Sequence, residues 1–212
     1  MKHFSNISTL IFDFGGVLID LDMNQSILNF KKLGVENVEK YLSNFGQSGF
    51  FMQLEKGEIS AEEFRSEIRK MTPKVVTDNE IDEAWNAFLV RIPAKKLDIV
   101  YELRKKYRVI MLSNTNAIHF PYAERTFFSH KNRSIDEYFD KCYRSYDMQM
   151  AKPDAEIFEA ILSQEQVAAN HCLLLDDGPK NIEQARKLGI QTYFVDPKED
   201  LSFLLTNINQ HL

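Results

Sequence analysis

Short apolar runs alternate with amphipathic helical patterns along most of this chain, and this alternation limits the possible folds more than any other feature. Buried strands are predicted at residues 7–14, 108–112, 142–146, 172–175 and 190–195. Helices are predicted at residues 94–106, 117–128, 153–162, 179–188 and 198–207. Strands that alternate with helices form a parallel sheet with helices on both faces. We therefore predict an α/β fold, a doubly wound parallel sheet of five strands.

The segment from residue 20 to residue 91 shows only helical patterns. Ser60 with Glu63, and Thr77 with Glu80, have the spacing of capping boxes at helix starts. Apolar side chains follow each box at helical spacing. We expect an all-helical unit at residues 20–91, inserted into an α/β core made of residues 1–19 and 92–212.

Composition excludes several classes of protein. The 212 residues include 26 Lys and Arg against 31 Asp and Glu, a net charge of −5, whereas nucleic-acid-binding domains usually carry a basic excess. The apolar runs fall far short of the ~20 residues that cross a membrane, and the N-terminal pattern is not that of a secretory leader. Two cysteines, Cys142 and Cys172, do not make a disulfide framework. We expect a cytoplasmic protein with no nucleic-acid and no membrane partner.

Carboxylates stand at two of the predicted strand ends. Asp13 ends the first apolar run just before Gly15 and Gly16. A buried carboxylate is unfavourable there unless it is paired or binds a cation. Asp176 and Asp177 end another run, and a divalent cation such as Mg²⁺ relieves their repulsion. Each motif alone is also typical of a polar turn, but together they indicate a cation site.

Groups suited to an anion stand at the other strand ends. Ser113 and Asn114 end the strand at 108–112, and a hydroxyl and an amide at a helix start are good phosphate ligands. Lys152 precedes the helix that begins at Pro153, within reach of an anion. Singly, these are ordinary capping and surface residues. Because open α/β sheets bind ligands at the carboxyl edge, we expect them to gather there with the acids.

In this order the four strand ends resemble the four-motif set of the haloacid dehalogenase superfamily. The motifs are Asp13-Phe-Gly-Gly-Val-Leu, Leu-Ser113-Asn114, Lys152-Pro153 and Leu-Leu-Asp176-Asp177-Gly-Pro-Lys-Asn181. The helical insertion resembles the small cap of its subfamily I. A closer resemblance is to the bacterial alpha-D-glucose-1-phosphate phosphatases, through Lys56-Gly-Glu-Ile-Ser-Ala-Glu-Glu-Phe64, Ser113-Asn-Thr-Asn116 and Lys152-Pro-Asp-Ala-Glu-Ile157.

The resemblance implies a Mg²⁺-dependent phosphatase that acts on a small phosphorylated metabolite, possible substrates including a sugar 1-phosphate. Asp13 would be the nucleophile and form an aspartyl-phosphate. Four residues would hold the metal: Asp13, the backbone carbonyl of Gly15, Asp177 and, through water or in support, Asp176. Three would hold the phosphoryl oxygens: Ser113, the catalytic lysine Lys152 and, as a helper, Asn114.

Gly15 departs from the superfamily pattern, in which most phosphatases carry a second aspartate at this position as general acid and base. A sugar 1-phosphate leaves as a hemiacetal oxygen, which needs less protonation, so we expect turnover to depend on the leaving group. Asp20 and Asp22 follow closely, but polar residues are normal where a chain turns into an inserted unit. Four aromatic or basic residues of the insertion are candidates for substrate selection: Phe50, Phe51, Trp85 and Arg91.

Two alternatives remain open. A 2-haloacid dehalogenase would use Asp13 to attack carbon without metal, and the acid pair Asp176-Asp177 argues against it. A non-catalytic binding protein with a degraded site is suggested by Gly15, but the retained Asp13, Lys152 and Asp177 argue against that reading.

Overall fold

A five-stranded parallel sheet forms the centre of the computed structural model, which describes residues 4, 6–42 and 47–207. The strand order is β5-β4-β1-β6-β7. The strands are β1 (Thr9–Phe12), β4 (Arg108–Ser113), β5 (Lys141–Arg144), β6 (Cys172–Asp176) and β7 (Gln191–Phe194). Each of the five predicted runs overlaps one of these strands, so the predicted sheet is confirmed.

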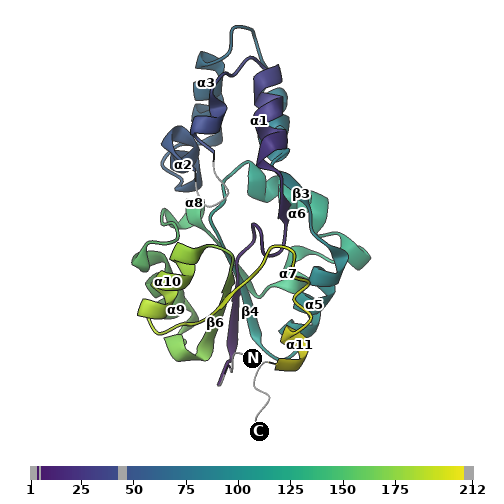
Figure 1. Ribbon diagram of the computed structural model, residues 1–212, viewed down its shortest axis with the longest axis vertical. Helices are drawn as coiled ribbons and strands as arrows, with labels where there is room; N and C mark the ends of the chain where they lie inside the picture. Colours follow the sequence, from purple (N-terminus) through teal and green to yellow (C-terminus); the bar gives the residue numbers. More distant parts are fainter. Residues whose placement is uncertain (1–3, 5, 43–46, 208–212) are drawn as a thin grey trace.

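Helices cover both faces of this sheet, as predicted. They are α5 (Ala94–Arg104), α6 (His119–Phe127), α7 (Ile135–Tyr138), α8 (Ser145–Met148), α9 (Ala155–Glu165), α10 (Pro179–Lys187) and α11 (Leu204–Asn207). Helices α9 and α10 lie on one side, and α5, α7 and α11 lie on the other (Figure 1). Successive side chains of β1 point to opposite faces of the sheet. Leu10 and Phe12 belong to one buried cluster, and Ile11 belongs to the second.

The last predicted helix, at residues 198–207, is wrong over its first half. Only Leu204–Asn207 is helical. Leu201 adopts a left-handed backbone with φ 64°, and the Asp200 carboxylate accepts the N–H of Ser202 in a local turn. A left-handed residue interrupts a right-handed helix, so the helix begins only after it.

Four helices stand together above the carboxyl edge of the sheet: α1 (Met23–Lys32), α2 (Gly49–Glu55), α3 (Ala61–Lys70) and α4 (Asp78–Asn86) (Figure 1). Both predicted capping boxes start a helix here, because Ser60 bonds reciprocally with Glu63, and Thr77 with Glu80. Ring contacts join the buried aromatic side chains of this unit: Phe30, Phe51, Phe64 and Trp85.

The expectation that this unit is all-helical is wrong. Strands β2 (Asp20–Leu21) and β3 (Leu89–Arg91) form an antiparallel ribbon where the chain enters and leaves the helices. Arg91 Nε lies 3.0 Å from Asp20 Oδ2 across the ribbon. Strands of two and three residues are too short to show a period-two pattern in the sequence. We propose that the four helices form a cap on the α/β core and that this ribbon marks its boundary.

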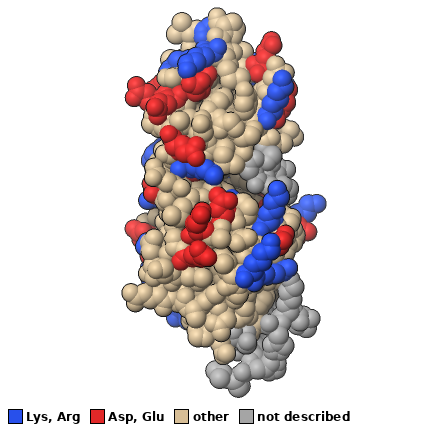
Figure 2. Space-filling view, turned by 90° about the vertical axis from the view of Figure 1, so that its left-hand side faces the viewer, with Lys and Arg blue, Asp and Glu red and all other residues tan. Residues whose placement is uncertain are grey.

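The charges on the surface and the lengths of the helices bear on the expectation that the protein has no nucleic-acid and no membrane partner. Basic and acidic side chains lie side by side on the face in Figure 2, over the helical unit and the α/β core alike. That face is mixed in charge, unlike the basic stripe of a nucleic-acid-binding surface. Among the helices formed by the described residues, none combines the length and the apolar character needed to span a bilayer.

Candidate active site

The loops at the carboxyl ends of the strands line a cavity of about 620 Å³ below the helical unit. Six of the residues singled out from the sequence line it: Asp13, Gly15, Ser113, Asn114, Lys152 and Asp177. The seventh, Asp176, is fully buried directly behind them. Parallel strands end at one edge of a sheet, and this topology brings together residues far apart in the sequence.

The Lys152 ammonium group lies between two carboxylates. Its Nζ is 2.8 Å from Asp13 Oδ1 and 2.7 Å from Asp176 Oδ2. Asp176 Oδ1 accepts hydrogen bonds from the N–H of Gly178 at 2.7 Å and from Asn181 Nδ2 at 2.9 Å. Burial disfavours the charge on Lys152, but the two carboxylates outweigh burial and raise the pKa of the lysine. Lys152 is therefore a fixed positive charge, oriented by Asp176 and directed at Asp13.

Asn114 fixes the loop that carries Lys152. Asn114 Nδ2 donates to the backbone oxygen of Lys152 at 2.9 Å, and Asn114 Oδ1 accepts the backbone N–H of Lys152 at 2.9 Å. The Asn114 carboxamide is thus engaged on both sides by one residue. Ser113 is buried beside it, and its hydroxyl makes a long 3.3 Å contact to the Asn114 carbonyl oxygen. This geometry favours a positioning role for Asn114 and leaves the Ser113 hydroxyl able to turn toward a ligand.

Three carboxylates fit the requirements of Mg²⁺. Ligand oxygens of Asp13, Asp176 and Asp177 all lie within 4.8 Å of one another. Burial and the two neighbouring acids raise the pKa of Asp13 to about 8, against the opposing effect of Lys152. Burial and the charge of Asp176 raise the pKa of Asp177 to about 6. Both shifts have the same cause, crowded negative charge in a buried place, and a divalent cation with oxygen ligands relieves it.

Gly16 makes room for this arrangement. Its φ is +71°, and a Cβ atom there would lie 2.0 Å from Asp177 Oδ2. The loop after β1 therefore passes so close to the Asp177 carboxylate that only glycine fits. Gly15 differs, because a Cβ there would meet only the end of the Leu21 side chain, at 3.2 Å.

The two aspartates after the first motif have structural partners. Asp22 Oδ1 accepts the N–H of Gln25 at 3.0 Å and caps α1. Asp20 pairs with Arg91 across the β2–β3 ribbon. Neither is among the residues that line the cavity. Their carboxylates therefore bind partners at the start of α1 and across the β2–β3 ribbon.

The candidates for substrate selection named from the sequence lie elsewhere. Phe50, Phe51, Trp85 and Arg91 are not among the described residues that line the cavity. Phe51 and Trp85 are fully buried in the aromatic core, because large rings fill the interior of a small helical unit. The helical unit contributes other side chains to the wall, namely Gln47, Met52, Glu55, Phe88 and Leu89. Sequence reasoning missed these, although Glu55 directly precedes the tract from Lys56 to Phe64.

Comparison with known proteins agrees with the fold and the site. Residues 7–189 match the haloacid dehalogenase-like hydrolase family. A D-ribitol-5-phosphate phosphatase of Bacteroides thetaiotaomicron is 34% identical over 205 residues, covering 95% of this chain and 100% of the relative.

Two solved structures are similar over nearly the whole chain. The HAD family enzyme BT-2542 from Bacteroides thetaiotaomicron, in complex with magnesium and inorganic phosphate, has 44% identity and a TM-score of 0.91, covering 94% of this chain and 98% of that one. A predicted HAD-like family hydrolase from Porphyromonas gingivalis has 37% identity and a TM-score of 0.87, covering 95% and 97%.

The fold, the acidic site with its buried lysine and these relatives define a phosphoric monoester hydrolase that uses Mg²⁺. The chain belongs to the haloacid dehalogenase-like hydrolase family. The superfamily resemblance found in the sequence is confirmed, and the finer resemblance to glucose-1-phosphate phosphatases stays a prediction.

Proposed function

We propose that this enzyme hydrolyses a small phosphorylated metabolite rich in hydroxyl groups, through an aspartyl-phosphate on Asp13. The observation that carries the proposal is the Lys152 ammonium group 2.8 Å from Asp13, held in place by Asp176. A fixed cation lets an anionic carboxylate approach an anionic phosphate and stabilises the charge that develops on the phosphoryl oxygens.

Covalent transfer proceeds in two steps. An Asp13 carboxylate oxygen forms a bond to phosphorus while the bond from phosphorus to the leaving oxygen breaks, and that oxygen takes a proton from water. A second water then attacks the phosphorus, and the bond from phosphorus to the Asp13 oxygen breaks, which frees the carboxylate and releases inorganic phosphate. The proton lost by this second water neutralises the hydroxide left by the first step. During both steps the Ser113 hydroxyl and Lys152 bind phosphoryl oxygens, and Asn114 keeps Lys152 in position.

Asp13, Asp177 and the Gly15 carbonyl would hold Mg²⁺. Asp176 would support them from behind, since its oxygens already bind Lys152, Gly178 and Asn181. When bound, the metal supplies positive charge to the phosphoryl oxygens.

For the substrate, two observations favour two related candidates. The whole-length relative named as a D-ribitol-5-phosphate phosphatase favours a pentitol 5-phosphate. Gly15, in the place of an acid, favours a sugar 1-phosphate with its better leaving group. A cytoplasmic location belongs to the same proposal, and both cysteines, Cys142 and Cys172, are free thiols.

An assay with Mg²⁺ added and then chelated tests the reaction class. We expect phosphate release from a panel of pentitol, sugar and aryl phosphates, loss of activity in EDTA and recovery on adding Mg²⁺. Halide release from a 2-haloacid without Mg²⁺ would support the dehalogenase alternative. Binding of phosphate esters without turnover would support a non-catalytic protein.

Replacing Asp177 should mainly weaken metal binding. We expect Asp177→Asn to raise the Mg²⁺ concentration for half-maximal activity by about tenfold or more, with a smaller loss at saturating Mg²⁺, because water can partly replace one ligand. Mg²⁺ titrations followed by activity and by melting temperature measure this. Asp136→Asn, at an exposed position on α7, is the matched control. Equal Mg²⁺ dependence in the Asp177 variant and the wild type would remove Asp177 from the metal site.

The two adjacent glycines should respond in opposite ways. Gly15→Asp introduces an acid at the position where the superfamily pattern has one, and its Cβ atom would meet only a Leu21 methyl group. General acid catalysis is worth about 10²–10⁴-fold, so we expect at least a tenfold gain on alkyl phosphates relative to aryl phosphates. Gly16→Ala should lose most activity on every substrate, because its Cβ atom overlaps the Asp177 carboxylate. Steady-state kcat/KM on alkyl and on aryl phosphates measures both effects. If Gly15→Asp leaves the alkyl-to-aryl ratio of kcat/KM unchanged, an acid at this position does not assist the leaving group.

A further inference from the structure

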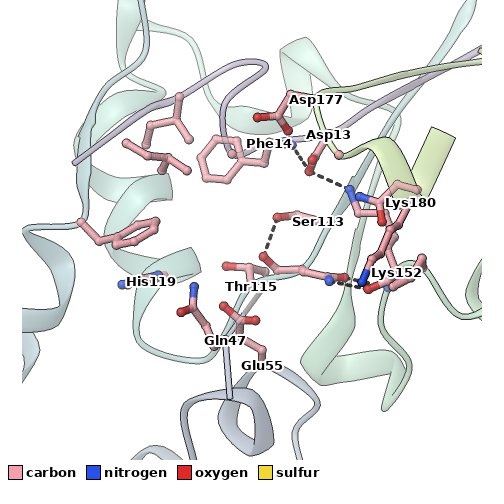
Figure 3. A pocket seen from close by; sticks show the side chains of 18 of the residues that line it. Asp13, Phe14, Gln47, Glu55, Ser113, Thr115, His119, Lys152, Asp177 and Lys180 are labelled. Carbon is pink, nitrogen blue, oxygen red and sulfur yellow. Dashed lines mark hydrogen bonds and ion pairs between the residues drawn. The ribbon is translucent and has the colours of Figure 1, made fainter. Parts of the chain in front are cut away.

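One wall of the cavity carries buried polar side chains that the phosphoryl-transfer steps do not use. Glu55 and Gln47 come from the helical unit, and Thr115 and His119 come from the loop after β4 and the start of α6. The exposed fractions of the four side chains are 9% or less. In Figure 3, Gln47 and Glu55 lie side by side near Thr115, on the side of the cavity away from Asp13 and Asp177.

Glu55 is the unusual member of this wall. Burial raises the pKa of Glu55 to about 8, and a hydrogen bond with the Gln47 side chain opposes this only in part. The carboxyl group is therefore mostly neutral near pH 7, with one O–H donor and one carbonyl acceptor. Burial also lowers the pKa of His119 to about 4, so that this ring is neutral as well. The wall thus offers hydrogen bonds without a charge that would repel a phosphate ester.

The backbone holds Glu55 firmly against the core. The Ser145 hydroxyl lies 2.5 Å from the Glu55 carbonyl oxygen and accepts the N–H of Thr115 at 3.0 Å. Two residues on, Gly57 has φ +66°, and a Cβ atom there would lie 2.1 Å from the Tyr146 carbonyl oxygen. These contacts fix the backbone of Glu55 relative to the loop that carries Ser113 and Thr115.

Apolar side chains line the same cavity. They are Phe14, Ile19, Leu21, Met52, Phe88 and Leu89. A cavity lined by both hydrogen-bonding and apolar groups suits a ligand that carries both hydroxyl and C–H groups. A carbohydrate or polyol chain has this character, and its hydroxyl groups can pair with buried polar groups that water no longer reaches.

We propose that Glu55, hydrogen-bonded to Gln47, binds a hydroxyl group of the leaving portion of the substrate and selects polyol and sugar phosphates over phosphate monoesters that lack hydroxyl groups. This inference rests on the proposed function and extends it, because it assigns substrate selection to a residue that takes no part in phosphoryl transfer. Glu55→Leu removes both hydrogen-bonding groups, whereas Glu55→Gln keeps a donor and an acceptor of nearly the same shape.

The test compares kcat/KM on D-ribitol 5-phosphate with kcat/KM on 4-nitrophenyl phosphate, as a ratio. We expect Glu55→Leu to lower this ratio about 10- to 100-fold and Glu55→Gln to recover most of it. Glu58→Leu, at an exposed position three residues along, should keep the wild-type ratio. Circular dichroism checks that each variant is folded, and Gln47→Leu, which should also lower the ratio, carries the test if Glu55→Leu does not fold.

A binding measurement separates this inference from the proposed reaction. Calorimetry with D-ribitol 5-phosphate and Mg²⁺, in the Asp13→Asn background, should show weaker binding when Glu55→Leu is added. If the wild type hydrolyses neither ester but binding still depends on Glu55, the proposed function fails and the inference stands. A parallel loss on both esters, or binding that does not depend on Glu55, overturns the inference.

Discussion

Asp13→Asn should reduce turnover by about 10⁴-fold or more, because no other group can form the covalent intermediate. The substitution keeps the shape of the side chain and removes one buried negative charge. Lys152 keeps its second partner, Asp176, at 2.7 Å, so the fold should remain intact. Steady-state assays with Mg²⁺ measure kcat, and acid quenching followed by peptide mass spectrometry should detect a phosphorylated Asp13 peptide in the wild type and no phosphorylated counterpart in Asp13→Asn.

Asp136→Asn serves again as the matched control, since Asp136 is exposed and lies on α7, away from the cavity. It should retain full turnover and a phosphorylated Asp13 peptide. Retention of a tenth or more of the wild-type kcat in Asp13→Asn would show that catalysis does not pass through this residue. Loss of folded protein would instead show that Asp13 is needed for structure, which circular dichroism distinguishes.

Much of the core could be predicted because its signals are local. An apolar run such as Leu10 to Phe12 identifies a strand, and in a parallel sheet the carboxyl ends of the strands share one edge. The sequence therefore predicts that Asp13, Lys152 and Asp177 lie together at this edge. Their roles stay predictions, since contacts in the resting protein do not test catalysis.

The helical unit was predicted less well because its packing is not local. Leu28 is an apolar residue of α1 that is 54% exposed, because it lies two residues from the buried Phe30 and so points to the opposite side of the helix. Trp85 was a candidate for substrate selection but fills the aromatic core. Glu55 was missed because an acid on a short helix is typical of a solvated surface, and the contacts of residues 55–57 with Ser145 and Tyr146 are not local in the sequence.

Lys152→Met should lower both stability and activity, because Lys152 is the only basic residue that forms an ion pair with Asp13 and Asp176 within the described part of the chain. Methionine fills much of the same volume but leaves two buried carboxylates facing each other without the lysine. Breaking a buried ion pair costs about 3–5 kcal/mol, which corresponds to a fall in melting temperature of about 10 °C for a chain of this size. Loss of the cation beside the nucleophile should lower kcat on the order of 10³-fold.

Mg²⁺ should distinguish this effect from a simple packing defect. A divalent cation bound by Asp13 and Asp177 neutralises part of the charge that Lys152→Met exposes, so Mg²⁺ should raise the melting temperature of the variant more than that of the wild type. Lys187→Met, where the lysine is exposed and pairs with Glu183 on the surface of α10, should change neither quantity. Thermal melts with Mg²⁺ and with EDTA measure these differences. If Lys152 and Mg²⁺ neutralise the same carboxylates, loss of the lysine must increase the stabilisation by Mg²⁺. Equal stabilisation of the variant and the wild type by Mg²⁺ would therefore mean that the lysine and the metal act on separate charges.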